Sequence, residues 1–468
     1  MSERDDEKPA GGLEPLGTIE RVLFAPVELW VVIVLLLLTG IAVIGFGAVV
    51  LDAARGKGRF GSMSRAALAI AEIPKTTQTL IWPDKPYRVW GSYKSDAQTS
   101  GWRVPRGTVS SLRGYILLSR YDGTDRRHKV ELVSLPSMRT VYSWRLDIDK
   151  IAQGAFVSRF AMPTNWTSER FRIVHPFLEN NGDLIVKDFY TPLFRVNVCG
   201  QLVWKIDSAV FHHSIEVDSD GNMWIPSIIE KSTIPEVSSN FQDDAITQIS
   251  QSGKVLYRKS VAEILIRHGL ANWLFSNAMY NADHVHLNDI QPVLSDGPFW
   301  KRGDLFISMR NVSAIMLYRP RTDQVLWIRR GPWISQHDVD VLDDHRIGIY
   351  DNGVEDRGGQ PFFPTNSEIM VYDFATNQVT LPVHEAMQKQ EIRTWMEGLF
   401  TQLPDGSIMV EDTMAGRLFV FGSDQSVRAE FINRGMDGWI YNLGWSRYID
   451  QAKGDVIVRN LQKVKCNA

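Results

Sequence analysis

The stretch GDLFISMRNVSAIMLYRPRTDQVLWIRR, residues 303–330, contains three short runs of β-branched, aromatic and other apolar residues separated by turns. A Gly-Asp pair precedes the first run, and polar groups with Asn, Ser, Pro and Asp separate the others. Apolar runs bounded by turn residues predict antiparallel strands joined by hairpins. The chain has few long helical patterns, so the predicted fold class is all-β.

The same pattern recurs along the chain. Five segments place a turn before a β-rich run: LENNGDLIVKD, EVDSDGNMWI, KRGDLFISMR, VLDDHRIGIYD and QLPDGSIMVED. Each is followed by a second pair of runs, and an earlier copy, VELVSLPSMRTVYSWRLD, brings the total to about six units. Four strands repeated roughly every 50 residues predict a six-bladed β-propeller over residues 101–468. Residues 439–460 are expected to supply strands that close the ring.

One apolar stretch precedes the repeats. Residues 29–51, LWVVIVLLLLTGIAVIGFGAVVL, carry no charge and are long enough, at about 1.5 Å per residue, to cross a hydrocarbon core of roughly 30 Å. The polar tail at residues 1–28 is longer than the start of a signal peptide, which favours retention as a transmembrane anchor. Residues 52–100 are then a linker and the first propeller-closing segment.

The orientation of this helix is read from the basic residues beside it. Arg55, Lys57 and Arg59 follow the apolar stretch closely, whereas Arg21 is the nearest basic residue before it. The positive-inside rule, taken alone, would place the large C-terminal part in the cytoplasm. Long domains translocate despite such a bias, so the rule does not decide the compartment.

Composition excludes several classes of partner and site. A formal net charge of −3 gives no general attraction to nucleic acid. Cys199 and Cys466 are too few for a disulfide framework or a cysteine zinc site, and leave one disulfide in an oxidising compartment. Trp144, Trp204 and Trp327 recur at one place in the repeat, which indicates packing between blades rather than binding of a cofactor or sugar.

Histidines recur at the start of the innermost strands. When the turns of the repeats are aligned, one position is occupied by His175, His213, His286, His337 and Gly398. Equivalent positions of a propeller converge on the central channel, so these histidines are expected to meet in space. His212 is expected to face the side opposite to His213, as neighbours on a strand do. The alternative is that each histidine only satisfies buried backbone groups.

Arg310 lies at the end of the predicted strand that follows the His286 strand in the same blade. Aspartates hold this position, within one residue, in three other repeats: Asp188, Asp351 and Asp412. A zinc site is a competing interpretation, because His284 and His286 are two residues apart and face the same way on a strand. Arg310 would repel a divalent cation in a shared pocket, so no metal is predicted.

Five segments carry a resemblance to a known family: FHHSIEVDSDGN, DHVHLNDI, GDLFISMRNVSAIMLY, VLWIRRG and SQHDVDVLDDHRIGIYDNG. In this order they resemble the bacterial arylsulfate sulfotransferases, which form a six-bladed propeller in the periplasm. The resemblance is strongest over residues 211–353. It implies transfer of a sulfuryl group from an aryl sulfate donor to a phenolic acceptor, without a nucleotide donor or cofactor. His284 and Asp289 stand where the family usually has Trp and Ser.

The resemblance also implies roles for individual residues. His337 matches the histidine that carries the sulfuryl group, and His286, Arg310 and His213 match the other catalytic groups. Substrate-binding positions are His212, His284, Asn288 and Asn352. Chemistry agrees, because a neutral imidazole attacks through a free ring nitrogen, a guanidinium presents a planar fork to sulfuryl oxygens, and a protonated histidine assists a phenolate leaving group.

The implied protein is therefore a sulfotransferase anchored in a bacterial inner membrane by one helix, with a periplasmic propeller. Its partners are the small-molecule donor and acceptor and the lipid bilayer. The alternative, from a different functional class, is a non-catalytic membrane-anchored propeller that binds a ligand or a protein.

Overall fold

The computed structural model describes residues 26–54, 59–71, 73, 89, 100–105, 112–156, 158–160, 166–276, 281–358 and 361–466. The chain divides into two compact units, Met1–Asp84 and Lys85–Ala468. Most of the predicted polar tail, residues 1–28, and much of the predicted linker, residues 52–100, lie outside the described residues.

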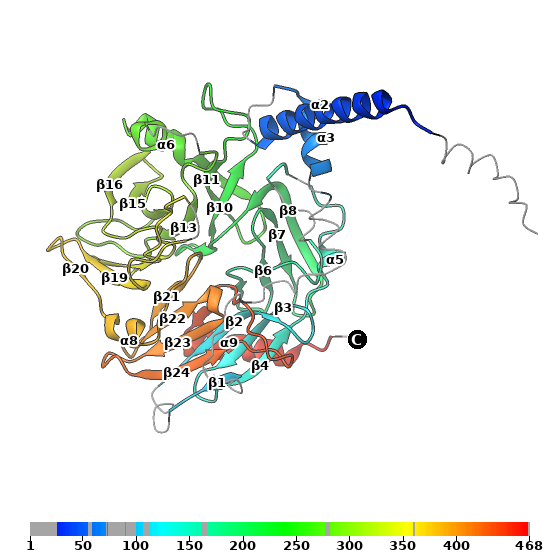
Figure 1. Ribbon diagram of the computed structural model, residues 1–468. Helices are drawn as coiled ribbons and strands as arrows, with labels where there is room; N and C mark the ends of the chain where they lie inside the picture. The colour runs from blue at the N-terminus through cyan, green and yellow to red at the C-terminus, as the bar shows by residue number, and fades with distance from the viewer. Residues whose placement is uncertain are drawn as a thin grey trace, which may run out of the picture. The chain divides into compact units, whose positions relative to one another are not determined.

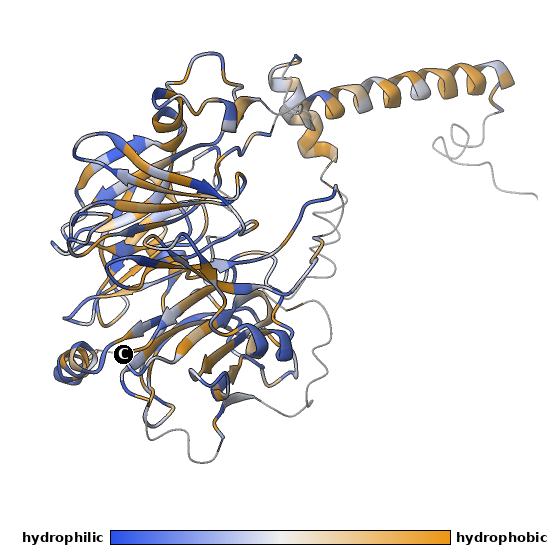
Figure 2. Ribbon diagram, turned by 90° about the vertical axis from the view of Figure 1, so that its left-hand side faces the viewer, coloured by the Kyte–Doolittle hydropathy of each residue, from blue (hydrophilic) through white to orange (hydrophobic). Residues whose placement is uncertain are grey.

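The first unit contains two described helices, α2 (Leu29–Ala54) and α3 (Ser62–Ala71). Helix α2 covers the whole predicted apolar span, and Figure 2 shows hydrophobic residues along nearly all of it. Its side chains are largely exposed, as at Leu36 and Ile44. By length and composition it is able to cross a membrane, and a signal sequence near an N-terminus has the same properties.

The second unit is all-β in its framework, as predicted. Its described residues form five antiparallel sheets, which follow one another around the unit in chain order from cyan to orange in Figure 1. Three sheets have four strands each: β25 (Arg447–Ile449), β2 (Tyr115–Asp122), β3 (Arg127–Ser134) and β4 (Arg139–Trp144); β13 (Leu287–Pro292), β14 (Leu305–Met309), β15 (Ala314–Arg319) and β16 (Gln324–Arg330); β17 (Val339–Val341), β18 (Arg346–Asp351), β19 (Glu368–Asp373) and β20 (Val379–Thr380).

The other two sheets are larger. One has five strands: β1 (Gly101–Arg103), β24 (Val427–Ile432), β23 (Arg417–Phe421), β22 (Ile408–Asp412) and β21 (Leu399–Gln402). The other has eight: β5 (Phe177–Leu178), β6 (Leu184–Val186), β7 (Thr191–Val196), β8 (Leu202–Phe211), β9 (Glu216–Val217), β10 (Met223–Ile229), β11 (Asp243–Ile249) and β12 (Val255–Ser260). Short helices join the strands: α5 (Ile148–Ile151), α6 (Val261–Arg267), α7 (Asn272–Phe275), α8 (His384–Lys389) and η3 (Thr413–Ala415).

The eight-stranded sheet differs from the expected six separate four-stranded units. Strand β8 is ten residues long and pairs with two neighbours. Ile206 and Phe211 are in register with Leu193 and Thr191 of β7, and Phe211 is also in register with Ser227 of β10. One long strand therefore joins two groups of strands into a single sheet. The all-β propeller-like fold is confirmed, and the number of six blades stays a prediction.

Pairing between strands from the two ends of the second unit closes the ring. Strand β1 pairs with β24, and β25 pairs with β2. Residues 439–460 supply one closing strand, β25, as predicted, and the rest of that stretch from Gln451 onward belongs to helix α9 (Gln451–Lys463) instead. Asp450 caps that helix by accepting a hydrogen bond from the backbone N–H of Lys453 at 2.9 Å. Ile457 and Leu461, four residues apart, are buried against the core.

Apolar clusters fill the space between neighbouring sheets. Trp144, Trp204 and Trp327 all pack against such clusters, as the repeat predicts. Of the three, only Trp144 is fully buried. The tryptophans therefore stabilise the framework through apolar contact.

A disulfide fixes the C-terminal helix. Cys199, in the turn between β7 and β8, is bonded to Cys466, which follows α9. The bond joins positions 267 residues apart, so it ties the end of the chain to a distant part of the ring. A crosslink of this kind restricts the unfolded chain.

We expect the double substitution Cys199→Ser and Cys466→Ser to lower the free energy of unfolding by about 2 to 5 kcal/mol, because the crosslink no longer restricts the unfolded chain. The check is denaturant unfolding of the full-length protein in detergent, followed by tryptophan fluorescence. Reductant should lower the unfolding midpoint of the parent and leave that of the double variant unchanged. An equal response of both proteins to reductant would contradict the stabilising role of the bond.

Candidate active site

Aromatic side chains from several sheets meet at the centre of the second unit. The ring of His213 lies 5.0 Å from that of His286 and 6.0 Å from that of His337. Trp445 lies 6.1 Å from His213 and 6.2 Å from His337. His175 contacts Trp445 at 5.4 Å. The histidines predicted to converge are therefore brought together, with a tryptophan among them.

Trp445 was not predicted as part of the centre, although the sequence contains a signal for it. Residues 445–450, WSRYID, match residues 213–218, HSIEVD, in their serine and aspartate. Trp445 thus occupies, two residues before the closing strand β25, the position that His213 occupies before β9. The sequence pattern predicted closing strands for residues 439–460 and therefore gave Trp445 no place at the centre.

Most of these central residues have a left-handed backbone: His175 (φ 47°), His213 (φ 52°), His286 (φ 52°) and Trp445 (φ 60°). This conformation interrupts the alternation of side chains along a strand. The prediction that His212 and His213 face opposite sides is wrong for that reason. Their Nδ1 atoms lie 2.8 Å apart, within hydrogen-bond distance.

His337 is held by hydrogen bonds at both ring nitrogens. Its Nδ1 lies 2.8 Å from Oδ1 of Asn352, and its Nε2 accepts from the backbone N–H of Glu397 at 2.8 Å. The Asn352 amide nitrogen donates to the carbonyls of Thr394 and Glu397, both at 2.7 Å. Its oxygen therefore faces His337 and can only accept, which places the proton of His337 on Nδ1. The lone pair is on Nε2.

Burial keeps the central imidazoles neutral. His337 is 1% exposed, and burial followed by the charge of Arg310 holds the pKa of His337 well below its usual value. Burial and the neighbouring His286 likewise hold the pKa of His213 well below that value. Both rings are accordingly neutral near pH 7, the form in which a ring nitrogen has a lone pair.

His286 has a different environment. Its Nδ1 lies 2.5 Å from a carboxylate oxygen of Asp283, and both side chains are about one-quarter exposed. Burial acts to raise the pKa of Asp283, but His286 outweighs it and the pKa is lowered. An ionised Asp283 accepts a hydrogen bond from Nδ1–H of His286, which leaves Nε2 of His286 to face other groups. Asp283 was not predicted, although it lies only three residues before His286 and begins the segment DHVHLNDI.

Arg310 is half-buried, and the described residues give it no carboxylate partner. Its Nη1 donates to Oδ1 of Asn311 at 2.9 Å, whereas its Nε is buried and has no hydrogen-bond partner among the described residues. Burial lowers the pKa of Arg310 from its usual high value, and a guanidinium remains charged in proteins. Donors that are desolvated and unused favour binding of an anion.

A buried ion pair supports the segment beside His337. Arg172 forms a two-pronged pair with the carboxylate of Glu397, in which Nη1 lies 2.5 Å from Oε1. The side chains are 6% and 1% exposed. Arg172 also donates from Nε to the carbonyl of Leu443 at 3.1 Å. Glu397 has a left-handed backbone with φ 63°, so the pair holds in place the N–H group that meets His337.

All four predicted substrate-binding residues are buried. Asn288 is fully buried and its amide nitrogen donates to the carbonyl of Gln336 at 2.9 Å. His284 packs against Phe241 and Phe275, with ring centroids 5.7 and 5.3 Å away. Thus His284 does not share the surroundings of His286, and the two do not form the zinc pair considered as an alternative. Asn352 contacts His337, and His212 contacts His213.

Asp289, which stands in place of the family's serine, is directed into the strand framework. Its Oδ2 accepts from the backbone N–H of Val339 at 3.2 Å and its Oδ1 from that of Ile290 at 2.8 Å. Burial, followed by the charge of Glu216, raises the pKa of Asp289 to about 7. A proton on this carboxyl relieves the cost of burying it.

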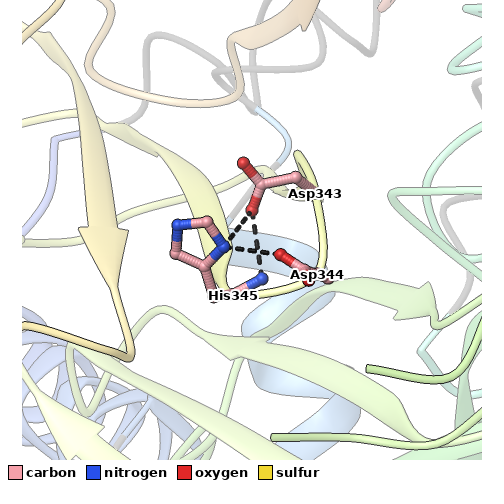
Figure 3. Close-up of side chains that lie close together, drawn as sticks. All are labelled: Asp343, Asp344 and His345. Atoms are coloured by element: carbon pink, nitrogen blue, oxygen red, sulfur yellow. Dashed lines mark hydrogen bonds and ion pairs between the residues drawn. The ribbon is translucent and has the colours of Figure 1, made fainter. Parts of the chain in front are cut away.

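A group of side chains whose ligand atoms are close enough together to hold a metal ion lies outside the central cluster. Asp343, Asp344 and His345 fall close together in the turn between β17 and β18, as Figure 3 shows. Nδ1 of His345 is 2.6 Å from Asp344, and Arg346 pairs with Asp343 at 2.6 Å. The turn is at the opposite end of β17 from His337. Its charges are already paired with one another, which explains the cluster without a metal.

Comparison with known proteins decides the family. The family model for arylsulfotransferases (ASST) matches residues 181–434, more than half of the 468 residues. The chain belongs to the arylsulfotransferase family. The matched region contains His213, His286, Arg310 and His337. No curated protein matches this family member.

Solved structures that are similar to this arylsulfotransferase-family chain include a protein of unknown function from Bacteroides caccae. Its TM-score is 0.44 with 10% identity, over 72% of this chain and 99% of that chain. The virginiamycin B lyase from Staphylococcus aureus has a TM-score of 0.33 with 11% identity, over 56% of this chain and 70% of that chain.

We expect Glu397→Gln to lower the free energy of unfolding of the arylsulfotransferase-family protein by about 3 to 5 kcal/mol, because it leaves the buried guanidinium of Arg172 without its charge partner. The measurement is denaturant unfolding of the full-length protein. Asp424→Asn, which breaks an exposed pair with Arg428, is the matched control and should change the midpoint little. Equal effects of the two substitutions would show that the buried pair does not stabilise the site.

Proposed function

We propose that the protein transfers a sulfuryl group from an aryl sulfate donor to a phenolic acceptor. The observation that carries the proposal is Arg310, a half-buried cation with an unused donor. Its backbone N–H donates to the carbonyl of His286 at 3.0 Å, and its charge acts on His337. A sulfate monoester presents three equatorial oxygens that match a planar guanidinium fork. Membership of the arylsulfotransferase family supports the same chemistry.

We propose His337 as the residue that carries the group. Its lone pair is on Nε2, and its neutral state at pH 7 leaves that pair available for attack on sulfur. In the resting structure the N–H of Glu397 donates to this nitrogen. Attack therefore requires that hydrogen bond to break as the N–S bond forms. The released N–H is then a donor for a sulfuryl oxygen.

The bond to the leaving phenolate breaks more easily with a proton donor nearby. His286 is suited to this role because Asp283 fixes its Nδ1–H and the ring is partly open to solvent. A histidine held in this way contributes roughly 100- to 10,000-fold as a general acid or base. His213, whose ring lies 5.0 Å from that of His286, is kept neutral by burial and is less suited to donate a proton.

The proposed location is the periplasmic side of a bacterial inner membrane, with α2 as the anchor. Two observations support it: helix α2 is long and apolar enough to cross a membrane, and Cys199 pairs with Cys466. Disulfides persist in oxidising compartments such as the periplasm. We also propose six blades, since β5–β8 and β9–β12 are two groups of four strands within the eight-stranded sheet.

We expect transfer in two half-reactions with a sulfuryl group on His337. Donor alone should release about one equivalent of phenol in a burst when the second step is slow. Peptide mapping under alkaline conditions should find the added group on the peptide with His337, and His337→Asn should abolish both signals in a folded protein. A sulfuryl group found on His213 or His286 instead would reject His337 as the carrier. Sequential kinetics with full activity of His337→Asn would reject the covalent route.

We expect Arg310→Lys to lower kcat/KM by an amount equal to about 2 to 4 kcal/mol of transition-state stabilisation, because one ammonium cannot make the two-pronged contact. Steady-state kinetics with a chromogenic aryl sulfate provide the measurement. Arg302→Lys, in an exposed turn at the far end of its blade, is the matched control and should keep the parent value. If Arg310→Lys keeps the parent kcat/KM, Arg310 does not make the proposed two-pronged contact with the sulfuryl group.

For the proposed topology, we expect protease added to intact spheroplasts to digest the propeller, because it then lies outside the inner membrane. Immunoblotting against the C-terminus follows the digestion. Lysed spheroplasts serve as the control for protease access. A propeller that is protected in intact spheroplasts and digested after lysis lies in the cytoplasm, as the basic residues after α2 alone would predict.

A further inference from the structure

Behind His213 lie a second histidine and a buried carboxylate. Nδ1 of His213 is 2.8 Å from Nδ1 of His212. Nε2 of His212 is 3.3 Å from Oδ1 of Asp244 on β11. His212 and Asp244 are 1% and 0% exposed. The separation of 3.3 Å is an ion-pair distance without linear hydrogen-bond geometry, and Nε2 of His212 has no hydrogen-bond partner among the described residues.

The carboxylate selects where the protons of the two rings are. A neutral His212 with its proton on Nδ1 would direct the lone pair of Nε2 at the carboxylate oxygen of Asp244, which is repulsive. The proton of His212 is therefore on Nε2, and its Nδ1 accepts the hydrogen bond from Nδ1–H of His213. The lone pair of His213 is then on Nε2. That nitrogen has no hydrogen bond within the part of the chain that the structure describes.

Asp244 itself is fixed by the framework. Its Oδ2 accepts from the backbone N–H of Leu287 at 3.1 Å, and Gln242 donates to its Oδ1 at 3.5 Å. The ring of Tyr190 packs on His212 with centroids 5.4 Å apart. The orientation of His212 is thus set from two sides, which is what a group that positions another residue requires.

We infer that Asp244 and His212 position His213 as the base that accepts the proton of the phenolic acceptor. The inference rests on the proposed function. In the second half-reaction the acceptor oxygen forms the new S–O bond, and the N–S bond to His337 breaks with its electron pair returning to Nε2. The phenolic proton passes to Nε2 of His213. The imidazolium that forms keeps its Nδ1–H bonded to His212, whose far side faces the Asp244 carboxylate.

Several groups surround His213 and bear on its charge. The rings of His286 and His337 lie 5.0 and 6.0 Å away, and Lys187 donates from Nζ to the carbonyl of His213. These groups and burial disfavour a positive charge at His213 in the resting state. In the resting state the ring of His213 is therefore a neutral base. The carboxylate of Asp244 offsets the positive charge that proton transfer creates on that ring.

Acceptors of different acidity test the inference in the full-length protein. For unsubstituted phenol, we expect His212→Phe to lower the rate of acceptor-dependent transfer about 100-fold or more, because the new ring accepts no hydrogen bond. Asp244→Asn should lower it about 10- to 100-fold. His212→Asn, whose oxygen lies near the former Nδ1, should stay within about 10-fold of the parent. KM for the donor should change little in all three.

The same variants should lose far less activity with a nitrophenol acceptor that is already ionised at the assay pH, since it has no proton to give. A merely structural role would lower the rates of all acceptors by the same factor. Asp243→Asn is the matched control: Asp243 is the buried neighbour of Asp244, and its Oδ1 accepts from the Ser260 hydroxyl at 2.5 Å. Its rates should show no dependence on acceptor acidity relative to the parent.

The outcomes separate this inference from the proposed function. A parent protein without acceptor-dependent phenol release would defeat the proposed function itself. A parent that turns over, with His212→Phe and Asp244→Asn unchanged or equally impaired for every acceptor, would overturn the positioning role alone. If His212→Phe fails to fold, Asp244→Asn with the acceptor series decides the question.

Discussion

The left-handed backbone at the start of the inner strands is the constraint on which the central cluster depends. Each residue of this kind costs roughly 1 to 2 kcal/mol when it is not glycine, so the framework must hold it in place. The strands that follow these residues are paired within the sheets, which fixes the backbone. The buried ion pair of Arg172 and Glu397 fixes the backbone of Glu397 in the segment beside His337. Without these turns, neighbouring side chains such as His212 and His213 would alternate between faces and could not meet.

Electrostatics then divides the centre into neutral and charged parts. His213 and His337 are buried and neutral, whereas Arg310 keeps its charge and lacks a carboxylate partner among the described residues. Nearby carboxylates are already engaged: Glu397 by Arg172 and Asp283 by His286. Arg310 therefore offers to a ligand a positive charge that is unpaired in the described part of the chain, whereas the carboxylate of Asp244 lies on the far side of His212 from His213. Such a site attracts an anion and disfavours a metal cation, which agrees with sulfuryl transfer by imidazole nitrogens.

The repeat made the fold and the histidine positions predictable, because aligned turns place equivalent residues at equivalent points of a propeller. Partners that act through single tertiary contacts left no such signal. Asp244 lies on β11, 32 residues after His212, and the N–H of Glu397 comes from a loop 60 residues after His337. The helix after Asp450 was missed because a β-rich context favoured strands, although Ile457 and Leu461 have helical spacing.

In the proposed function, the central histidines and Arg310 catalyse transfer rather than only binding a ligand or partner. Acceptor-dependent release of phenol is the most direct measurement. Purified full-length protein is mixed with a chromogenic aryl sulfate, with and without a phenolic acceptor, and corrected for a protein-free blank. We expect phenol release that increases with acceptor concentration and is lost in Arg310→Ala. Folded protein that releases no more phenol than the blank, with or without acceptor, would contradict the proposed function and favour a non-catalytic propeller.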